Sequence, residues 1–179
     1  ALGTVAALGL SRPHMPFKGL IMAILISPMI VPLIITAAGM FFFYSKLGLT
    51  HSYTGLILAH TALGTPFVVI TVTATLTGFD NNLIRASQSL GADTMRTFFK
   101  VIMPLILPGV ISGALFAFIT SFDEVVVVLF VGSVEQVTIP RQMWAGLRQE
   151  ISPVILCMAT CLVALSIALL TTVELLRRR

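Results

Sequence analysis

Two adjacent carboxylates, Asp123 and Glu124, stand within a long apolar part of the chain and have the clearest potential for chemistry. The residues from 101 to 122 carry no charge, and an apolar run from 125 to 134 follows the pair. Charged groups inside a membrane span are costly and usually face a cavity or a partner. A carboxylate in a low dielectric attracts a cationic amine. Two interpretations stay open: contact with a cationic substrate, or a structural role, either pairing with a basic residue of another subunit or capping a helix break near Ser121.

His60 is the second candidate, because it lies in the middle of another apolar stretch. Its imidazole can line a pathway or form a hydrogen bond to a neighbouring helix. Cys157 and Cys161 are four residues apart and share a helix face. Thiols in such a place are usually small core residues, and no His or carboxylate beside them completes a ligand set. No metal site is therefore expected.

Catalytic signatures are missing from the sequence. It contains neither an HExxH nor a GxSxG pattern, and its three histidines fall on different segments. A membrane-embedded enzyme would need such a constellation. The phosphate-binding pattern GxxxxGK[ST] is missing as well, so this chain is not expected to hydrolyse ATP itself. We expect a non-catalytic chain.

The elements that position these residues are expected to be membrane-spanning helices. The chain is 57% hydrophobic and only 10% charged, with a mean hydropathy of +1.03, whereas globular domains carry roughly 25% charged residues. No alternation of the barrel type is present. Four segments have about the 18 apolar residues that a spanning helix needs: Leu20–Tyr44 (interrupted by two prolines), Tyr53–Phe79, Val101–Phe122 and Pro153–Val173. The third either ends at Phe122 or continues to Val131 and takes both carboxylates into the hydrophobic zone.

The first ten residues form a further apolar run, Ala1–Leu10, which is too short to cross a bilayer of roughly 30 Å. Basic residues follow this run instead of preceding it, unlike in a signal peptide. We expect it to be the tail of an earlier helix. The sequence thus predicts an all-α integral membrane protein, a polytopic helical bundle of about five spans with its N-terminal part missing.

The distribution of basic residues predicts the orientation. Successive loops alternate between the two sides, and of the eleven Lys and Arg residues eight fall on one side and three on the other. Cytoplasmic loops carry the excess of basic residues. The segment 80–104 and the C-terminus are therefore expected to be cytoplasmic.

The segment 80–104 has the pattern of two short helices joined by a glycine. Asp80, Asn81 and Asn82 offer side-chain oxygens that can cap a first helix, and Asp93 can cap a second, which is expected over Thr94–Lys100. Gly91 suits the left-handed position that ends a helix. Pro104 suits the beginning of the next span. The pattern predicts a helix, a glycine elbow and a helix across the membrane surface; a plain amphipathic interfacial pair is the alternative.

The same residues resemble a known motif. Ala86, Gly91, Val101, Met103 and Pro104 stand at the spacing of the EAA motif of binding-protein-dependent ABC importer permeases. The chain departs from that motif at four positions, with Arg85 for Glu, Ser87 for Ala, Val101 for Ile and Met103 for Leu. The resemblance implies that this loop is a coupling helix that sits in a groove of a separate ATPase subunit, where Arg85 can pair with an acidic residue. The implied coupling positions are Arg85, Ala86, Ser87, Gly91, Ala92, Val101, Met103 and Pro104.

Further stretches, Leu76–Asp80, Ser121–Val128 and Ile139–Trp144, resemble the inner-membrane permeases of spermidine/putrescine importers. This implies one permease domain over 1–179 with a type I ABC importer fold, in the bacterial inner membrane. The implied partners are a second permease subunit (a heterodimer), an ATPase dimer that binds ATP and Mg²⁺, and an extracytoplasmic binding protein, with no nucleic acid and no cofactor in this chain. The implied substrate is a polyamine that passes Asp123, Glu124 and His60. An opine, a phosphonate or ferric iron is the alternative within this class, and an ion-gradient-driven transporter or channel is the alternative outside it.

The segment 132–152 is expected on the outer side. In the family such loops meet the loaded binding protein, which implies contacts by Arg141, Trp144 and Arg148. Alternatively, this segment is an interfacial gate with Trp144 at the level of the lipid headgroups, where tryptophan is favoured.

Overall fold

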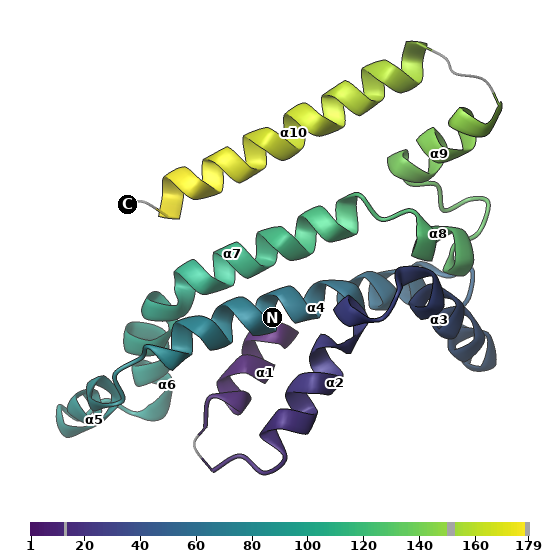
Figure 1. Cartoon of the computed structure of the whole chain (residues 1–179). Coiled ribbons are helices and arrows are strands. Elements are labelled where there is room, and N and C mark those ends of the chain that lie inside the picture. The colour runs from purple at the N-terminus through teal and green to yellow at the C-terminus, as the bar shows by residue number, and fades with distance from the viewer. Residues whose placement is uncertain (13, 150–152, 178–179) are drawn as a thin grey trace.

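The computed structural model describes residues 1–12, 14–149 and 153–177, with side chains except at 148–149 and 173–177. All regular structure in these residues is helical, which confirms the all-α prediction (Figure 1). A π-helical segment, Phe98–Ile102, joins α6 to α7. The α-helices are α1 (Leu2–Leu10), α2 (Lys18–Ile30), α3 (Leu33–Leu47), α4 (Tyr53–Thr77), α5 (Asn82–Ser89), α6 (Thr94–Thr97), α7 (Met103–Phe122), α8 (Val126–Val131), α9 (Ile139–Gln149) and α10 (Pro153–Arg177).

Three helical stretches in the described residues are long and apolar enough to cross a membrane: Tyr53–Thr77, Thr94–Phe122 and Pro153–Thr172. The pair α2 and α3 provides a fourth span if the two are counted as one. With the short apolar α1, this is close to the arrangement predicted from the sequence. Figure 1 shows the turn after α1, the α5–α6 region and the C-terminal end of α10 at one end of the molecule, and α8 and α9 at the other.

The first predicted span, Leu20–Tyr44, is sharply bent, because α2 and α3 meet at 107°. The bend lies at Val31, which is extended at φ −71° and ψ 136°, directly before Pro32. A residue before proline is driven out of the helical region by the proline ring. Pro28 lies inside α2 without ending it, and Ser27 donates its hydroxyl to the Ile24 carbonyl (2.8 Å) that Pro28 leaves without an amide partner.

The third predicted span ends at Phe122, so its continuation to Val131 is wrong. Asp123 follows the last turn of α7, and the separate α8 starts at Val126. At its other end the span is longer than predicted. The helix expected over Thr94–Lys100 is continuous with α7 through the π-helical segment and is not a separate surface helix.

Helices α4 and α7 pack most closely, along a line of glycines. A Cβ on Gly109 would lie 2.3 Å from Thr75 Oγ1, and a Cβ on Gly113 would lie 2.3 Å from Thr71 Oγ1 and 2.7 Å from Val68 Cα. Small residues let helix backbones approach in this way in membranes. These two helices therefore form the central pair of the chain, and α1 and α2 contact α4 from another side.

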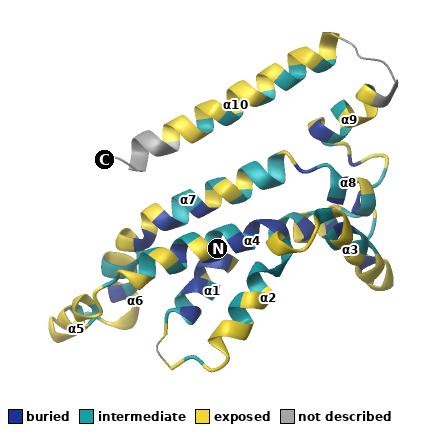
Figure 2. Ribbon diagram, viewed as in Figure 1, coloured by how far each residue is buried: buried dark blue, intermediate teal, exposed yellow. Residues whose placement is uncertain are grey.

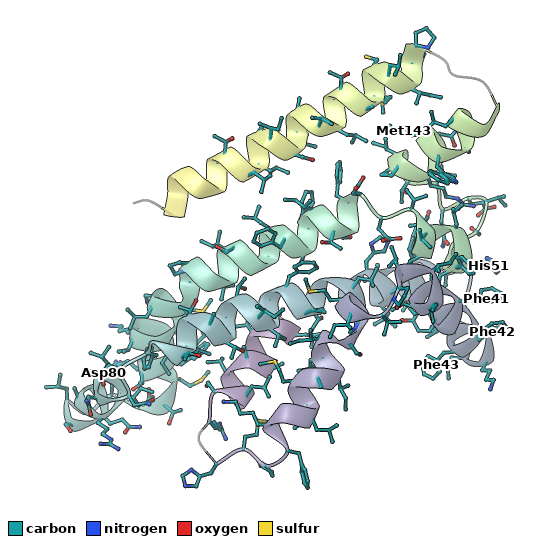
Figure 3. All side chains as sticks on the ribbon, viewed as in Figure 1. Phe41, Phe42, Phe43, His51, Asp80 and Met143 are labelled. Carbon is teal, nitrogen blue, oxygen red and sulfur yellow. The ribbon has the colours of Figure 1, made fainter. Side chains whose placement is uncertain are left out.

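Much of the remaining helix surface is apolar and uncovered within this chain (Figure 2). No residue in the apolar window of α10 is buried. Figure 3 shows Phe41, Phe42 and Phe43 together on α3, at the opposite end of the molecule from Asp80. Such a surface suits lipid or other subunits, as expected for an integral membrane chain.

Candidate functional site

The glycine elbow predicted from the sequence is present after α5. Gly91 has φ +81°, and its N–H donates to the Gln88 carbonyl at 2.9 Å. The Ala92 N–H donates to the Ser87 carbonyl at 3.1 Å. These bonds close the last turn of α5, as glycine in the left-handed region does at helix ends.

A carboxylate caps the second short helix, as predicted, whereas α5 has Asn81 at its N-cap and no side-chain capping bond there. The Asp93 side chain accepts a hydrogen bond from the Arg96 N–H at 2.7 Å and caps α6. The Asp80 side chain accepts one from the Asn82 N–H at 2.9 Å, just before α5. Each of these two hydrogen bonds joins residues no more than three positions apart, so the local sequence determines both.

Helix α5 is a surface element, since none of its residues is buried in this chain. Arg85 and Ala86 are exposed, and so is Leu90, with 88% of its surface accessible. Beyond the elbow, Met95 and Phe99 are exposed as well. Exposed apolar side chains of this kind suit contact with lipid or with another subunit.

Not every predicted coupling position faces outward. Ser87 is half-buried, and its hydroxyl shares a hydrogen bond with the Thr97 hydroxyl at 2.7 Å. Thr97 is 3% exposed and was not predicted from the sequence. Ala92 is half-buried at the elbow.

The motif ends in the π-helical segment and the first turn of α7. Val101 lies within the π-helical segment, and Met103 and Pro104 begin α7. The Met103 N–H bonds to the Phe98 carbonyl, five residues back. Pro104 has no N–H to donate and its ring crowds the carbonyl four residues before it, so a wider turn relieves both problems. The proline therefore joins the elbow to the span without interrupting the helix.

A groove of about 850 Å³ lies where α4, α7, the start of α1 and the start of α9 meet. His60 lines it, and its Nδ1 shares a hydrogen bond with the Ser121 Oγ at 2.8 Å. His60 therefore bonds the neighbouring helix, as one interpretation expected, while its place on a substrate pathway stays a prediction. Thr61 and Thr65 add hydroxyls to an otherwise mainly apolar wall.

Neither Asp123 nor Glu124 lines the groove, and the two carboxylates differ in exposure. Glu124 is 5% exposed, and its Oε1 accepts a hydrogen bond from the Val127 N–H at 2.7 Å. It caps the start of α8, which is the structural role considered for the pair. Asp123 is exposed at the break after α7, and the two residues before it, Ser121 and Phe122, line the groove. The structure thus separates a buried capping carboxylate from an exposed one.

The loop from 132 to 138 is held by side chains of its own region. Arg141 donates from Nη1 to the carbonyls of Ser133 and Gln136, the latter at 3.0 Å. The Gln136 side chain, 6% exposed, accepts from the Ser133 N–H at 3.0 Å. His51 Nδ1 lies 3.3 Å from the Gly132 carbonyl and ties the loop to the start of α4.

The other residues expected near the binding protein lie on α9. Trp144 is 48% exposed there. The backbone of Arg148 belongs to α9, but its side chain lies outside the described residues.

The cysteines are not the small core residues predicted from the sequence. Cys157 and Cys161 are both exposed on α10, which packs little of its surface against the rest of the chain. Among the residues that the structure describes, no group of three His, Cys, Asp or Glu side chains is placed to hold a metal ion.

The chain belongs to the family described as "Binding-protein-dependent transport system inner membrane component", whose profile matches residues 1–179. Its fold is similar to a chain of the inward-facing MetNI methionine ABC transporter, with a TM-score of 0.76 and 22% identity over 99% of this chain and 85% of that one.

Relatives of known function belong to one subgroup in particular. The spermidine/putrescine transport system permease protein PotC of Haemophilus influenzae is 31% identical over 99% of this chain and 69% of its own length. PotC of Escherichia coli K12 is 30% identical over 99% and 67%. The putrescine transport system permease protein PotI of Escherichia coli K12 is 29% identical over 89% and 59%. The resemblance to polyamine permeases is thereby confirmed.

Proposed function

We propose that this chain forms half of the substrate pathway of an ATP-driven importer and couples to a separate ATPase dimer through residues 80–104. The observation that carries the proposal is the exposed α5, ended by Gly91 and followed by a helix that runs without interruption into the span of α7. A partner that moves α5 therefore acts directly on a membrane helix beside the groove.

The charge distribution supports a cytoplasmic position for this segment and for the C-terminus, in a bacterial inner membrane. Figure 1 shows the turn after α1 and the α5–α6 region at one end of the molecule; the sequence places five Lys and Arg residues in these two regions up to position 100, against two in α9 at the other end. Basic residues are enriched on the cytoplasmic side. ATP and Mg²⁺ would then be bound by the partner on that side.

The outer end of the molecule supports contact with an extracytoplasmic binding protein through Arg141, Trp144 and Arg148. Arg141 already holds the loop from 132 to 138 in one conformation. A preformed loop binds a partner at a lower entropic cost than a mobile one. Arg141 thus contributes to the docking surface by shaping it.

A polyamine is the substrate that the groove and the relatives support best. A polyamine is a chain of methylenes between ammonium groups; the groove offers a mainly apolar wall, and the exposed Asp123 follows directly after Ser121 and Phe122, which line it. His60 adds a polar group to that wall, and Glu124 supports the break that presents Asp123. Three relatives named above are permeases for spermidine or putrescine.

A neutral or anionic organic solute is a second candidate, favoured by one comparison. The sulfoquinovosyl glycerol transport system permease protein SmoH of Agrobacterium fabrum is 28% identical over 72% of this chain and 45% of its own length. Its substrate carries no ammonium group for Asp123 to attract. The charge of the substrate is therefore what an experiment must decide.

Uptake by the reconstituted importer tests this function. The chain, its partner permease, the ATPase and the binding protein are placed in proteoliposomes, and uptake of labelled putrescine is measured with wild type and with Asp123→Asn. We expect uptake to fall about tenfold or more in the variant, since an attraction between full charges is lost. Asp123→Glu keeps the negative charge at the same position, is the matched control and should retain uptake. Equal uptake by Asp123→Asn and wild type would remove the proposed substrate contact.

Binding of the ATPase is tested at the elbow. A Cβ added to Gly91 would have nothing within 4 Å, so Gly91→Ala strains only the backbone, whereas Gly91→Trp also adds bulk to the proposed docking face. We expect the ATPase to co-purify with Gly91→Ala and to be lost, or uncoupled from uptake, with Gly91→Trp. Full transport by Gly91→Trp would contradict the proposed docking face.

A further inference from the structure

We propose that Ser87 and Thr97 form a hydrogen-bonded link that carries the movement of α5 to α7, so that both are positioning residues for coupling. The proposal rests on the coupling role proposed above for residues 80–104. It assigns to Ser87 an internal function in place of a direct contact with the ATPase.

The link is short and shielded from water. The Ser87 Oγ and the Thr97 Oγ1 lie 2.7 Å apart, and Thr97 is only 3% exposed. The Ser87 hydroxyl also donates to the Ile84 carbonyl within α5, at 3.2 Å. Because a hydroxyl has one proton and two lone pairs, Ser87 can donate to Ile84 and accept from Thr97 at the same time. The arrangement satisfies both hydroxyls without water.

Helix α5 has few other attachments to the rest of the chain. It has no buried residue, and the backbone bonds at the elbow return to α5 itself without reaching α6. Ile84 of α5 and Phe98 beyond the elbow both line a cavity of about 380 Å³, which leaves space beside the two helices. Gly91, with its positive φ and open surroundings, is a natural pivot. Without the link, α5 would be free to tilt about this pivot.

The position of Thr97 gives the link its mechanical consequence. Thr97 is the last residue of α6, directly before the π-helical segment that leads into α7. A displacement of α5 is therefore passed to α7 by this hydrogen bond, together with the packing of α5 against α6 and the π-helical segment that precedes α7. At position 87 the EAA motif has alanine, which has no hydroxyl, so the link follows from a departure of this chain from the motif.

The number of substrate molecules imported per ATP hydrolysed tests the link. It is measured for the complete importer in proteoliposomes with wild type, Ser87→Ala, Thr97→Val and the double variant. Each single variant should lower this ratio by about two- to tenfold, the effect expected for one hydrogen bond. The double variant should lower it no further, because both changes remove the same bond. Thr160→Val on α10 is the matched control, since its hydroxyl donates to the Leu156 carbonyl in the same helix (2.9 Å) and lies outside residues 80–104, and it should keep the wild-type ratio.

A covalent replacement separates coupling from simple stability. The two native cysteines are first removed by Cys157→Ser and Cys161→Ser. Cysteines are then introduced by Ser87→Cys and Thr97→Cys. Since the native oxygens at these positions are 2.7 Å apart, the two sulfurs lie within reach of a disulfide. Import per ATP should reach the wild-type ratio when the pair is oxidised and fall when it is reduced.

Two results would overturn the link. One is an unchanged ratio in Ser87→Ala and Thr97→Val while the wild-type importer is coupled, and the other is no difference between the oxidised and reduced cysteine pair. Both leave the proposed function intact. Failure of the wild-type chain to bind any ATPase would instead refute the proposed function together with the link.

Discussion

The close approach of α4 and α7 makes the substitution of single glycines by alanine a quantitative test of the fold. The central pair is held at a distance that leaves no room for a methyl group at Gly113, where a Cβ would lie 2.3 Å from Thr71 Oγ1 and 2.7 Å from Val68 Cα. Carbon atoms pack best at about 3.5–4.0 Å, so the helices must separate by roughly 1 Å. Overpacking of this size costs about 1–3 kcal/mol.

Alanine also stabilises a helix relative to glycine, and a control has to remove that contribution. Gly39 on α3 is exposed and has nothing within 4 Å of its Cβ position. Gly39→Ala should raise the free energy of unfolding by about 0.5–1 kcal/mol, the ordinary helix preference of alanine. The free energy of unfolding of Gly113→Ala should be about 1–3 kcal/mol lower than that of Gly39→Ala, because only the alanine at 113 must push a neighbouring helix away. The measurement is denaturant unfolding of the purified chain in detergent micelles.

Gly109 offers a sharper version of the same test. Its Cβ would meet Thr75 Oγ1 at 2.3 Å, but the next neighbour, the Thr71 carbonyl oxygen, lies at 3.0 Å. Adding Thr75→Ala to Gly109→Ala should therefore restore most of the unfolding free energy that Gly109→Ala alone loses. Thr71→Ala should not rescue Gly113→Ala, because the backbone of Val68 still blocks the methyl group. Equal stability of Gly113→Ala and Gly39→Ala, or equal rescue of both pairs, would refute the close approach of these helices.

Three further substitutions test the polar contacts near the groove and the outer loop. Glu124→Ala should lower the free energy of unfolding by about 0.5–2 kcal/mol through loss of the α8 cap, and Glu124→Gln by less because its amide oxygen still accepts the Val127 N–H; equal losses would contradict the capping role. Ser121→Ala should cost about 0.5–1.5 kcal/mol by the same unfolding assay, because His60 loses its partner; no loss would show that the bond is not formed. Arg141→Ala should raise the rate of proteolytic cleavage within residues 132–138 several-fold, because the side-chain bonds to the loop are lost. Arg141→Lys should give an intermediate rate, because an ammonium lacks the guanidinium fork. Equal cleavage rates in all three proteins would show that Arg141 does not hold the loop.

The local features of residues 80–104 were predictable because their causes lie close together in the chain. The positive φ of Gly91 and the Asp93 cap depend on residues within four positions of each other, and both predictions are confirmed. The bend near Pro32 was also indicated, since the ring acts on the residue before it. The continuity of the helix from Thr94 into α7 was missed, because glycine and proline patterns do not show that a π-helical turn can absorb Pro104.

The charge and apolarity of the sequence by themselves determined that this is a helical membrane chain, because spanning a bilayer requires long apolar stretches with internally bonded backbones. The glycine, the capping residues and the proline of residues 80–104 also predicted the elbow and its motif spacing. Only the tertiary structure decided which carboxylate is buried and which is exposed, that His60 bonds Ser121, and that Ser87 faces Thr97. The physical reason is that these outcomes depend on the direction in which a helix is packed and where it breaks. A sequence of apolar residues leaves both open, since any face of such a helix is compatible with lipid.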